Sequence, residues 1–175
     1  KEAKNLGIEL LVLDDGWFGK RNGDNCSLGD WYVNKDKLPG GIGNLAKKVN
    51  DIGIKFGLWF EPEMVSPDSD LYRNHPDWCI HTEGRCRTEC RFQLTLDLTR
   101  KEVREYITDS VSKILDEANI AYVKWDMNRH MSEIGSASLE PEKQNEFSHR
   151  YILGLYEMME NIVSSHPDVL FESCS

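Results

Sequence analysis

The sequence predicts an α/β fold, more specifically a partial (β/α)8 TIM barrel with about four parallel strands and helices between them. Short apolar runs bounded by polar residues recur along the 175 residues, and stretches with helical periodicity separate them. Each connection is long enough to return the chain parallel to the strand before it. A complete barrel takes about 250 residues, so four strands correspond to roughly half of one. No glycine-rich phosphate turn follows any run, which disfavours a nucleotide-binding fold.

The first part of the chain contains two of the expected strands. Lys1 to Asn5 has the pattern of a last helical turn, and the run Ile8 to Leu13 is the first strand. Phe18 to Pro39 is rich in Gly, Asn, Asp and Ser, so we expect an irregular loop on the surface. Apolar residues recur at helical spacing from Ile42 to Asp51. The second buried strand follows at Ile54 to Phe60.

The middle of the chain is expected to combine a long loop with one strong helix. Met64 to Leu98 contains two prolines and three cysteines, and we interpret it mainly as a loop with short elements. The sequence Thr99-Arg100-Lys101-Glu102 has the pattern of a capping box. Apolar residues then continue on one helical face as far as Ala118.

The last part of the chain supplies two further strands and the helix between them. Ile120 to Trp125 is an apolar run that ends beside Asp126. Pro141 suits the first turn of a helix, and an apolar stripe continues from Phe147 to Ile162. Val169 to Phe171 is the last expected strand, which completes four strands separated by helices.

The composition excludes several functional classes. A net charge of −9 and an isoelectric point near 5.0 argue against a nucleic-acid partner. No apolar run approaches the ~20 residues of a membrane span. The five cysteines have no regular spacing, which favours a reducing compartment, and we expect a cytoplasmic location. The chain starts at Lys1 without an initiator Met, and we expect both ends to lie within a longer chain, so the missing signal sequence carries little weight.

Four residues of the long loop raise the question of a metal. Cys79, His81, Cys86 and Cys90 are close in sequence, but their spacing matches no common zinc motif. We therefore interpret them as ordinary loop residues and expect neither a metal nor another cofactor. No role is predicted for the three cysteines.

Acidic, amide and aromatic residues gather at the predicted carboxyl ends of the strands. That end of a parallel sheet or barrel is where ligands bind. Carboxylates and amides pair with vicinal hydroxyls, and tryptophan packs on the apolar face of a sugar ring, so the set favours a carbohydrate site. Glycoside hydrolysis needs two carboxyl groups beside the scissile bond. The candidates are Asp14, Asp15, Trp17, Trp59, Glu61, Glu63, Lys124, Asp126, Asn128, Glu172 and Cys174.

Structural alternatives exist for some of these candidates. Asp14 and Asp15 have the pattern of residues that cap a turn before a glycine, and Trp125 fits an ordinary core position. Lys124 and Asp126 fit a simple ion pair. However, alternate residues of a strand point to one face, so Lys124, Asp126 and Asn128 are expected to converge while Trp125 points away. This convergence favours a site.

Four motifs in this order resemble the catalytic barrel of bacterial glycoside hydrolase family 36 α-galactosidases. They are DDGWF at 14–18, GLWFEPEMV at 57–65, KWDMNR at 124–129 and ESCS at 172–175. The resemblance implies retaining hydrolysis of terminal α-galactosides, such as melibiose and raffinose, through a covalent galactosyl-enzyme. It implies that Asp126 is the nucleophile. The residues it implies for binding the galactose are Asp14, Asp15, Trp59, Arg91, Lys124, Asn128 and Cys174, with Arg91 beside a CRTEC segment that departs from the usual loop.

The same resemblance implies that residues 1–175 are a fragment of a single catalytic domain, with strands two to five of the barrel. The acid/base of the family lies beyond Ser175, so the fragment is expected to be inactive on its own. The open edges of a partial barrel are expected to favour a homo-oligomer. Galactosyl transfer, as in raffinose and stachyose synthases, and a non-catalytic carbohydrate-binding half-barrel are the alternatives to hydrolysis.

Overall fold

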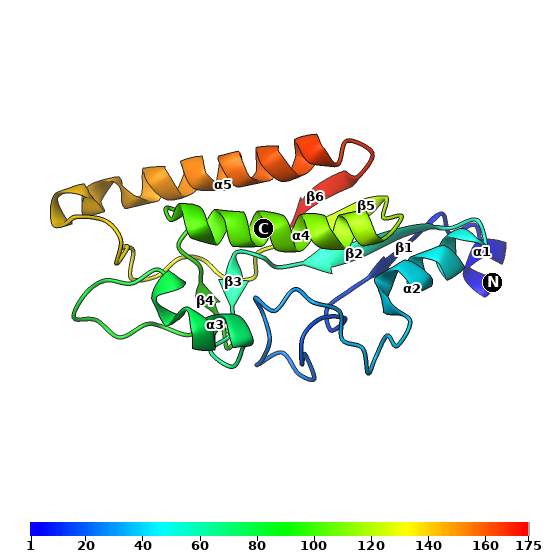
Figure 1. The fold of residues 1–175 in the computed structure, drawn as a ribbon, viewed down its shortest axis with the longest axis horizontal. Helices are drawn as coiled ribbons and strands as arrows, with labels where there is room; N and C mark the ends of the chain where they lie inside the picture. Colours follow the sequence, from blue (N-terminus) through cyan, green and yellow to red (C-terminus); the bar gives the residue numbers. More distant parts are fainter. Residues whose placement is uncertain (175) are drawn as a thin grey trace.

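The computed structural model describes residues 1–174 and confirms the parallel α/β architecture (Figure 1). In this part of the chain the main sheet has the strand order β1-β2-β5-β6, and all neighbouring strands are parallel. The order follows the sequence, as expected for consecutive strands of a barrel wall. The strands are β1 (Leu10–Leu13), β2 (Lys55–Phe60), β5 (Tyr122–Asp126) and β6 (Leu170–Cys174).

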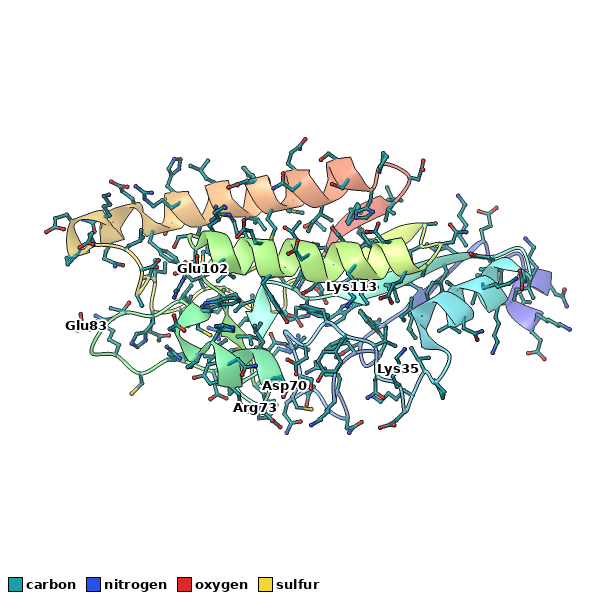
Figure 2. The ribbon with its side chains drawn as sticks, in the orientation of Figure 1. Lys35, Asp70, Arg73, Glu83, Glu102 and Lys113 are labelled. Carbon is teal, nitrogen blue, oxygen red and sulfur yellow. The ribbon has the colours of Figure 1, made fainter. Side chains whose placement is uncertain are left out.

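Helices connect the strands and cover one face of the sheet. In Figure 1, α4 and α5 lie side by side along the sheet, and α2 lies nearer the N-terminus. The predicted helical stripes are confirmed, because the buried residues of α4 recur at helical spacing from Val103 to Leu115. Three α-helices connect the strands of the main sheet, α2 (Gly41–Asn50), α4 (Lys101–Glu117) and α5 (Phe147–Ser165). The short helix α1 (Glu2–Asn5) precedes the first strand. Glu102 and Lys113, labelled in Figure 2, are exposed residues of α4.

The two faces of the sheet differ in character. Phe56, Leu58 and Phe60 alternate along β2 and are fully buried on the helix-covered face. Leu58 and Phe60 pair in register with Val123 and Trp125 of β5, which are also buried. The opposite face carries Lys124 and Asp126 of β5, with Glu172 and Cys174 of β6 opposite them. The sheet therefore has an apolar outer face and a face toward the barrel interior on which a polar site can form.

Two strand boundaries differ from the prediction in a way that matters for the site. The ladder between β5 and β6 continues to the pair Asp126 and Cys174, so both residues lie within the sheet. The sequence placed the end of each strand earlier because polar residues interrupt the apolar runs. Pairing with a neighbouring strand extends the regular backbone past that interruption.

The capping box predicted at the start of α4 is wrong. Arg100 is the N-cap residue, and no side chain caps the helix. The Thr99 hydroxyl instead donates to the carboxylate of Asp97 at 2.6 Å, and Glu102 pairs with Arg100 at 2.8 Å. Asp97 is buried and needs donors, which explains why the threonine bonds to it rather than to the helix.

The prediction of a surface loop at Phe18 to Pro39 is also wrong in one respect. The segment is irregular, but Phe18, Leu28 and Trp31 are buried. The Trp31 ring lies 4.4 Å from the Phe18 ring and 5.4 Å from the Phe60 ring, measured between centroids. The aromatic residues of this loop pack against the end of β2, so they are part of the core.

The long segment between β2 and α4 contains short elements, as predicted. Two strands pair antiparallel, and a short helix, α3 (Asp70–Asn74), follows the first of them. Asp70 and Arg73, labelled in Figure 2, form an ion pair on this helix at 2.6 Å. The remaining elements are β3 (Met64–Val65), η1 (Pro76–Trp78), β4 (Leu94–Thr95) and η2 (Pro141–Glu146). No helix within residues 1–174 is long and apolar enough to cross a membrane.

Glu63 is a buried carboxylate that joins the sheet to α5. It accepts hydrogen bonds from the Trp125 indole at 3.1 Å and the Tyr151 hydroxyl at 2.9 Å. Burial raises the pKa of the Glu63 carboxyl above its ordinary value of 4.5, and these two hydrogen bonds act in the opposite direction. Both donors therefore stabilise the ionised form of Glu63 in the core.

We predict that Tyr151→Phe destabilises the protein by about 1–3 kcal/mol, because one buried oxygen of Glu63 loses its donor. The loss raises the folded-state pKa of Glu63 further. A carboxyl group with a raised pKa loses stability as the pH rises from its unfolded-state pKa to its folded-state pKa. The extra destabilisation of the variant therefore grows as the pH rises above the folded-state pKa of Glu63 in the wild type, which itself lies above 4.5. Thermal unfolding of both proteins across this pH range measures the effect.

Tyr156→Phe is the matched control, because Tyr156 lies on the same helix and is 64% exposed. Its expected effect is within about 0.5 kcal/mol at every pH. Equal unfolding midpoints for the two variants would contradict the role assigned to Glu63.

Candidate active site

Asp126 is held by three hydrogen bonds. The Trp59 indole donates to Oδ2 of Asp126 at 2.9 Å, and the side-chain amide of Asn128 donates to the same oxygen at 2.7 Å. The main-chain N–H of Met127 donates to Oδ1 at 3.0 Å. Asp126 is 8% exposed. The carboxylate is therefore fixed in orientation at the carboxyl end of β5 and still reaches the surface.

The register of the sheet explains which predicted residues come together. Lys124 lies opposite Trp59 on one side and Glu172 on the other, and Asp126 lies opposite Cys174. Residues paired across parallel strands point to the same face of the sheet. Trp59, Lys124, Asp126 and Cys174 therefore share the face toward the barrel interior. Within the described residues Lys124 and Asp126 form no ion pair, so their proximity does not come from a simple charge pair.

Cys174 lies at the edge of this group. Partial burial and the negative charge of Asp126 raise the pKa of its thiol, whereas the positive charge of Lys124 acts in the opposite direction. The main-chain carbonyl of Cys174 accepts a hydrogen bond from the N–H of Met127 at 3.1 Å. The end of β6 is thus attached directly to the backbone that follows Asp126.

Asp14 and Asp15 follow β1 and have different environments. Asp15 accepts hydrogen bonds from two nitrogens of the Arg21 guanidinium, from Nη2 at 2.7 Å and from Nε at 2.9 Å and 3.1 Å. Arg21 is 4% exposed and also donates to the carbonyls of Asp24 and Cys26. The carboxylate of Asp14 is exposed, and it accepts the N–H of Asp15. Both acids are therefore exposed, and Asp15 is the one that an arginine holds in place.

Arg21 was not among the residues identified from the sequence. It lies in a loop of mixed polar residues and belongs to no motif, so its sequence position gave no signal. Trp17 is a candidate from the sequence with no assigned role. Its indole donates to the Trp59 carbonyl at 3.0 Å and so attaches the end of β1 to β2. Together these contacts hold the two acids at the same edge of the sheet as Asp126.

Arg91 lies on a two-residue turn with unusual backbone geometry. Arg91 and Phe92 have φ angles of 54° and 59°, in the left-handed region, and Cys90 and Gln93 pair on either side of them. Such a conformation costs about 1–3 kcal/mol at each non-glycine residue. The Arg91 side chain is exposed. No hydrogen bond or ion pair joins Arg91 to Asp126 in the part of the chain that the structure describes.

A second arginine that the sequence did not single out holds this turn. Arg129 is buried and donates through Nη1 to the carbonyls of Gln93 at 2.7 Å and Thr88 at 2.8 Å. Arg129 directly follows Asn128, so the turn that carries Arg91 is attached to the segment after the Asp126 strand. The motif KWDMNR contains this arginine, but the motif by itself does not indicate that the side chain holds a distant turn.

Glu61 and Glu63 were both expected at the carboxyl ends of the strands, and the structure separates them. Glu63 bonds to Trp125 and Tyr151 in the core, so it does not face the site. Glu61 accepts the main-chain N–H of Asn128 at 2.7 Å. Burial raises the pKa of the Glu61 carboxyl above its ordinary value. Only Glu61 is connected to the surroundings of Asp126.

The cysteine-rich loop contains no metal-binding arrangement among residues 1–174. No three His, Cys, Asp or Glu side chains lie close enough together to hold an ion. Cys79 is buried, and burial raises the pKa of its thiol to about 12. Cys86 and Cys90 are exposed and unpaired.

A pocket of about 530 Å³ lies away from Asp126, between the loops at 81–83 and 134–144. Figure 2 places Glu83, one of its lining residues, at the end of the molecule opposite the N-terminus. None of the predicted site residues lines the pocket. The lining residues are His81, Thr82, Glu83, Ile134, Ser136, Ala137, Leu139, Pro141 and Gln144.

The geometry around Asp126 defines what the site can do. A sheltered carboxylate with a fixed orientation, beside an ammonium group and an amide, can attack an electrophilic carbon or bind hydroxyl groups. The exposed Asp14 and Arg91 offer further groups of opposite charge. This combination suits a polyhydroxylated ligand.

Comparison with known proteins gives a consistent result. The family model described as Melibiase matches residues 1–175. The chain is 61% identical over 175 residues to the α-galactosidase AgaA of Geobacillus stearothermophilus, and 52% identical over 174 residues to the α-galactosidase Mel36A of Lactobacillus acidophilus. The matches cover 100% and 99% of this chain and 24% of each relative. The chain thus spans about a quarter of the length of these curated relatives.

Solved structures of similar proteins have the same fold. The crystal structure of the GH36 α-galactosidase AgaA from Geobacillus stearothermophilus matches with a TM-score of 0.97 and 61% identity, over 99% of this chain and 24% of that chain. A variant of AgaA in complex with raffinose matches with the same TM-score and coverage at 60% identity. The α-galactosidase from Thermus thermophilus in complex with stachyose matches with a TM-score of 0.69 and 30% identity, over 95% of this chain and 33% of that one.

Proposed function

The chain belongs to the melibiase family, and we propose that the whole protein hydrolyses terminal α-galactosides of the melibiose and raffinose type with retention of configuration. The observation that carries the proposal is the position of Asp126. Its carboxylate is held by Trp59 and Asn128 at the carboxyl end of β5, within a fold that matches a raffinose complex of an α-galactosidase. That relative supports an α-galactoside as the substrate.

In the proposed reaction Asp126 is the nucleophile. Its carboxylate attacks the anomeric carbon of the galactosyl unit, and the bond from that carbon to the leaving oxygen breaks. A second carboxyl group protonates this oxygen, and water later cleaves the covalent galactosyl-enzyme. The resemblance places this acid/base after Ser175. Retention requires the two carboxyl groups to be about 5–5.5 Å apart.

Glu61 is a poor candidate for the second carboxyl group, although it lies near Asp126. One of its oxygens accepts the N–H of Asn128, and the other accepts the side-chain amide of Gln93 at 3.2 Å. Glu61 is also 1% exposed. A proton donor must reach the glycosidic oxygen, and neither oxygen of Glu61 is available for that.

The remaining predicted residues are proposed to bind the galactose. Lys124 and the accessible carboxylate of Asp14 are suited to hydroxyl groups, with Asp15 held in place by Arg21. The binding roles of Trp59, Arg91, Asn128 and Cys174 rest on the resemblance. Trp59 is nearly fully buried and donates to Asp126, which supports a role at the reacting end of the sugar. A cytoplasmic location also remains a proposal, which fractionation of the source cells would test.

We predict that Asp126→Gly in the full-length protein lowers kcat for a nitrophenyl α-galactoside by at least about 10³-fold, because the nucleophile is removed. Added azide should restore turnover and release a β-galactosyl azide, since a small anion replaces the carboxylate in a single displacement. Product analysis by NMR measures both the rescue and the configuration.

Asp15→Asn is the comparison variant, because Asp15 is also an acid of the site but is assigned to binding. Azide should not restore its activity. A galactosyl azide formed equally by both variants, or full activity of Asp126→Gly, would exclude Asp126 as the nucleophile.

We predict that a polypeptide of residues 1–175 alone has no measurable activity toward a nitrophenyl α-galactoside, because the resemblance places the acid/base beyond Ser175. Calorimetry with galactose distinguishes binding from catalysis in the same sample. Binding without turnover is the expected result if the sugar contacts form in the fragment. Turnover at the rate of the full-length protein would refute the placement of the acid/base.

We also predict that this polypeptide self-associates. Among the described strands, β1 pairs only with β2 and β6 only with β5, which leaves one open edge on each. Leu11 and Leu170 on these two strands are exposed. Open edges with exposed apolar residues favour association. Light scattering at micromolar concentration should therefore give a mass above that of a monomer, and a monodisperse monomer would contradict the prediction.

A further inference from the structure

We propose that Glu61 is a positioning residue that orients Asp126 through Asn128. The inference rests on the proposed function, because it assumes that Asp126 is the nucleophile. Neither the family match nor the motif pattern assigns a role to Glu61. Glu61 is a buried carboxylate, and its hydrogen-bond donors among residues 1–174 are the neutral Asn128 and Gln93.

Asn128 joins the two carboxylates. Its main-chain N–H donates to Oε1 of Glu61 at 2.7 Å, and its side-chain amide donates to Oδ2 of Asp126 at 2.7 Å. The side-chain rotamer of Asn128 depends on its backbone, and Glu61 holds that backbone from another strand end, 67 residues away in sequence. A shift of Asn128 would therefore move the donor that fixes Asp126.

Glu61 also connects this segment to the turn that carries Arg91. Its Oε2 accepts the side-chain amide of Gln93, the last residue of the turn, at 3.2 Å. Arg129 holds the Gln93 carbonyl from the other side. Asn128 and Arg129, the two residues after Met127, are thus fixed against the turn. Glu61 bonds to both Asn128 and the turn.

The contact with Asn128 depends on a hydrogen bond and not on an ion pair. Burial raises the pKa of the Glu61 carboxyl, the negative charge of Asp126 adds to the rise, and Arg91 opposes it. Both groups that donate to Glu61 are neutral, namely the N–H of Asn128 and the side-chain amide of Gln93. A glutamine at position 61 can accept the same N–H, so we expect the acceptor oxygen rather than the charge of Glu61 to position Asn128.

Glu61→Gln is expected to fold, because a buried acceptor lies within reach of its new amide. The Oε1 atom of Gln93 is buried and has no hydrogen-bond partner, and Gln93 is 2% exposed. In Glu61→Gln, the new amide can donate to this oxygen after Gln93 rotates by half a turn about its last bond. Both hydrogen bonds of residue 61 are then kept, and the negative charge is lost.

The test compares kcat and KM in the full-length protein, with a nitrophenyl α-galactoside as the probe. Glu61→Asp shortens the side chain and withdraws the acceptor from the N–H of Asn128. It is expected to lower kcat by about 10-fold to 100-fold, with a smaller change in KM, because the nucleophile is misplaced relative to the sugar. Glu61→Gln keeps the acceptor and is expected to retain most of the wild-type kcat.

Glu63→Gln is the matched control. Glu63 is also buried and also has a raised pKa, but its partners are Trp125 and Tyr151 in the core. This variant should change the unfolding midpoint and leave kcat and KM as in the wild type.

The outcomes separate the inference from the proposed function. Active wild-type protein in which Glu61→Asp keeps the kcat of the wild type overturns the inference alone. An equal loss of kcat in Glu61→Asp and Glu61→Gln does so too, because the hydrogen bond kept by glutamine is then irrelevant. Wild-type protein without α-galactosidase activity overturns both, since no nucleophile is then left to position.

Discussion

The register between β2 and β5 is the constraint on which the site depends. It places Trp59 opposite Lys124, and the Trp59 indole then reaches Asp126, two residues further along β5. A slip of one residue would turn every side chain of β5 to the other face and bury Lys124 and Asp126 among apolar residues. The alternating apolar residues of both strands prevent such a slip, because the helices cover only one face of the sheet.

The two glutamates after β2 have different hydrogen-bond partners, although they follow the same strand. Glu63 bonds to α5 and stabilises the packing of the sheet against its helices, whereas Glu61 bonds to the backbone after Asp126. Both carboxylates are buried and both have raised pKa values, so burial alone does not distinguish them. Their hydrogen-bond partners do, because one set of donors belongs to the core and the other to the site.

Buried arginines perform a related function in the loops. Arg21 holds Asp15 and two carbonyls of its own loop, and Arg129 holds two carbonyls of the segment around Arg91. The guanidinium group has several donors in a rigid plane, so a single arginine can fix several acceptors of an irregular backbone. The loops at the carboxyl ends therefore have a defined structure without regular secondary structure, which is what a precisely arranged sugar site requires.

The sequence by itself determined the parallel α/β architecture, the order of strands and helices, and the convergence of Asp126 and Asn128, because these follow from short-range periodicity and from the alternation of side chains along a strand. The sequence wrongly predicted a capping box at Thr99, and it did not predict the burial of Phe18 and Trp31. Only the tertiary structure decided those features, together with the separate roles of Glu61 and Glu63 and the contacts of Arg21. Each depends on which distant donor meets a buried acceptor, and the need of buried polar groups for partners is satisfied across the fold rather than along the chain.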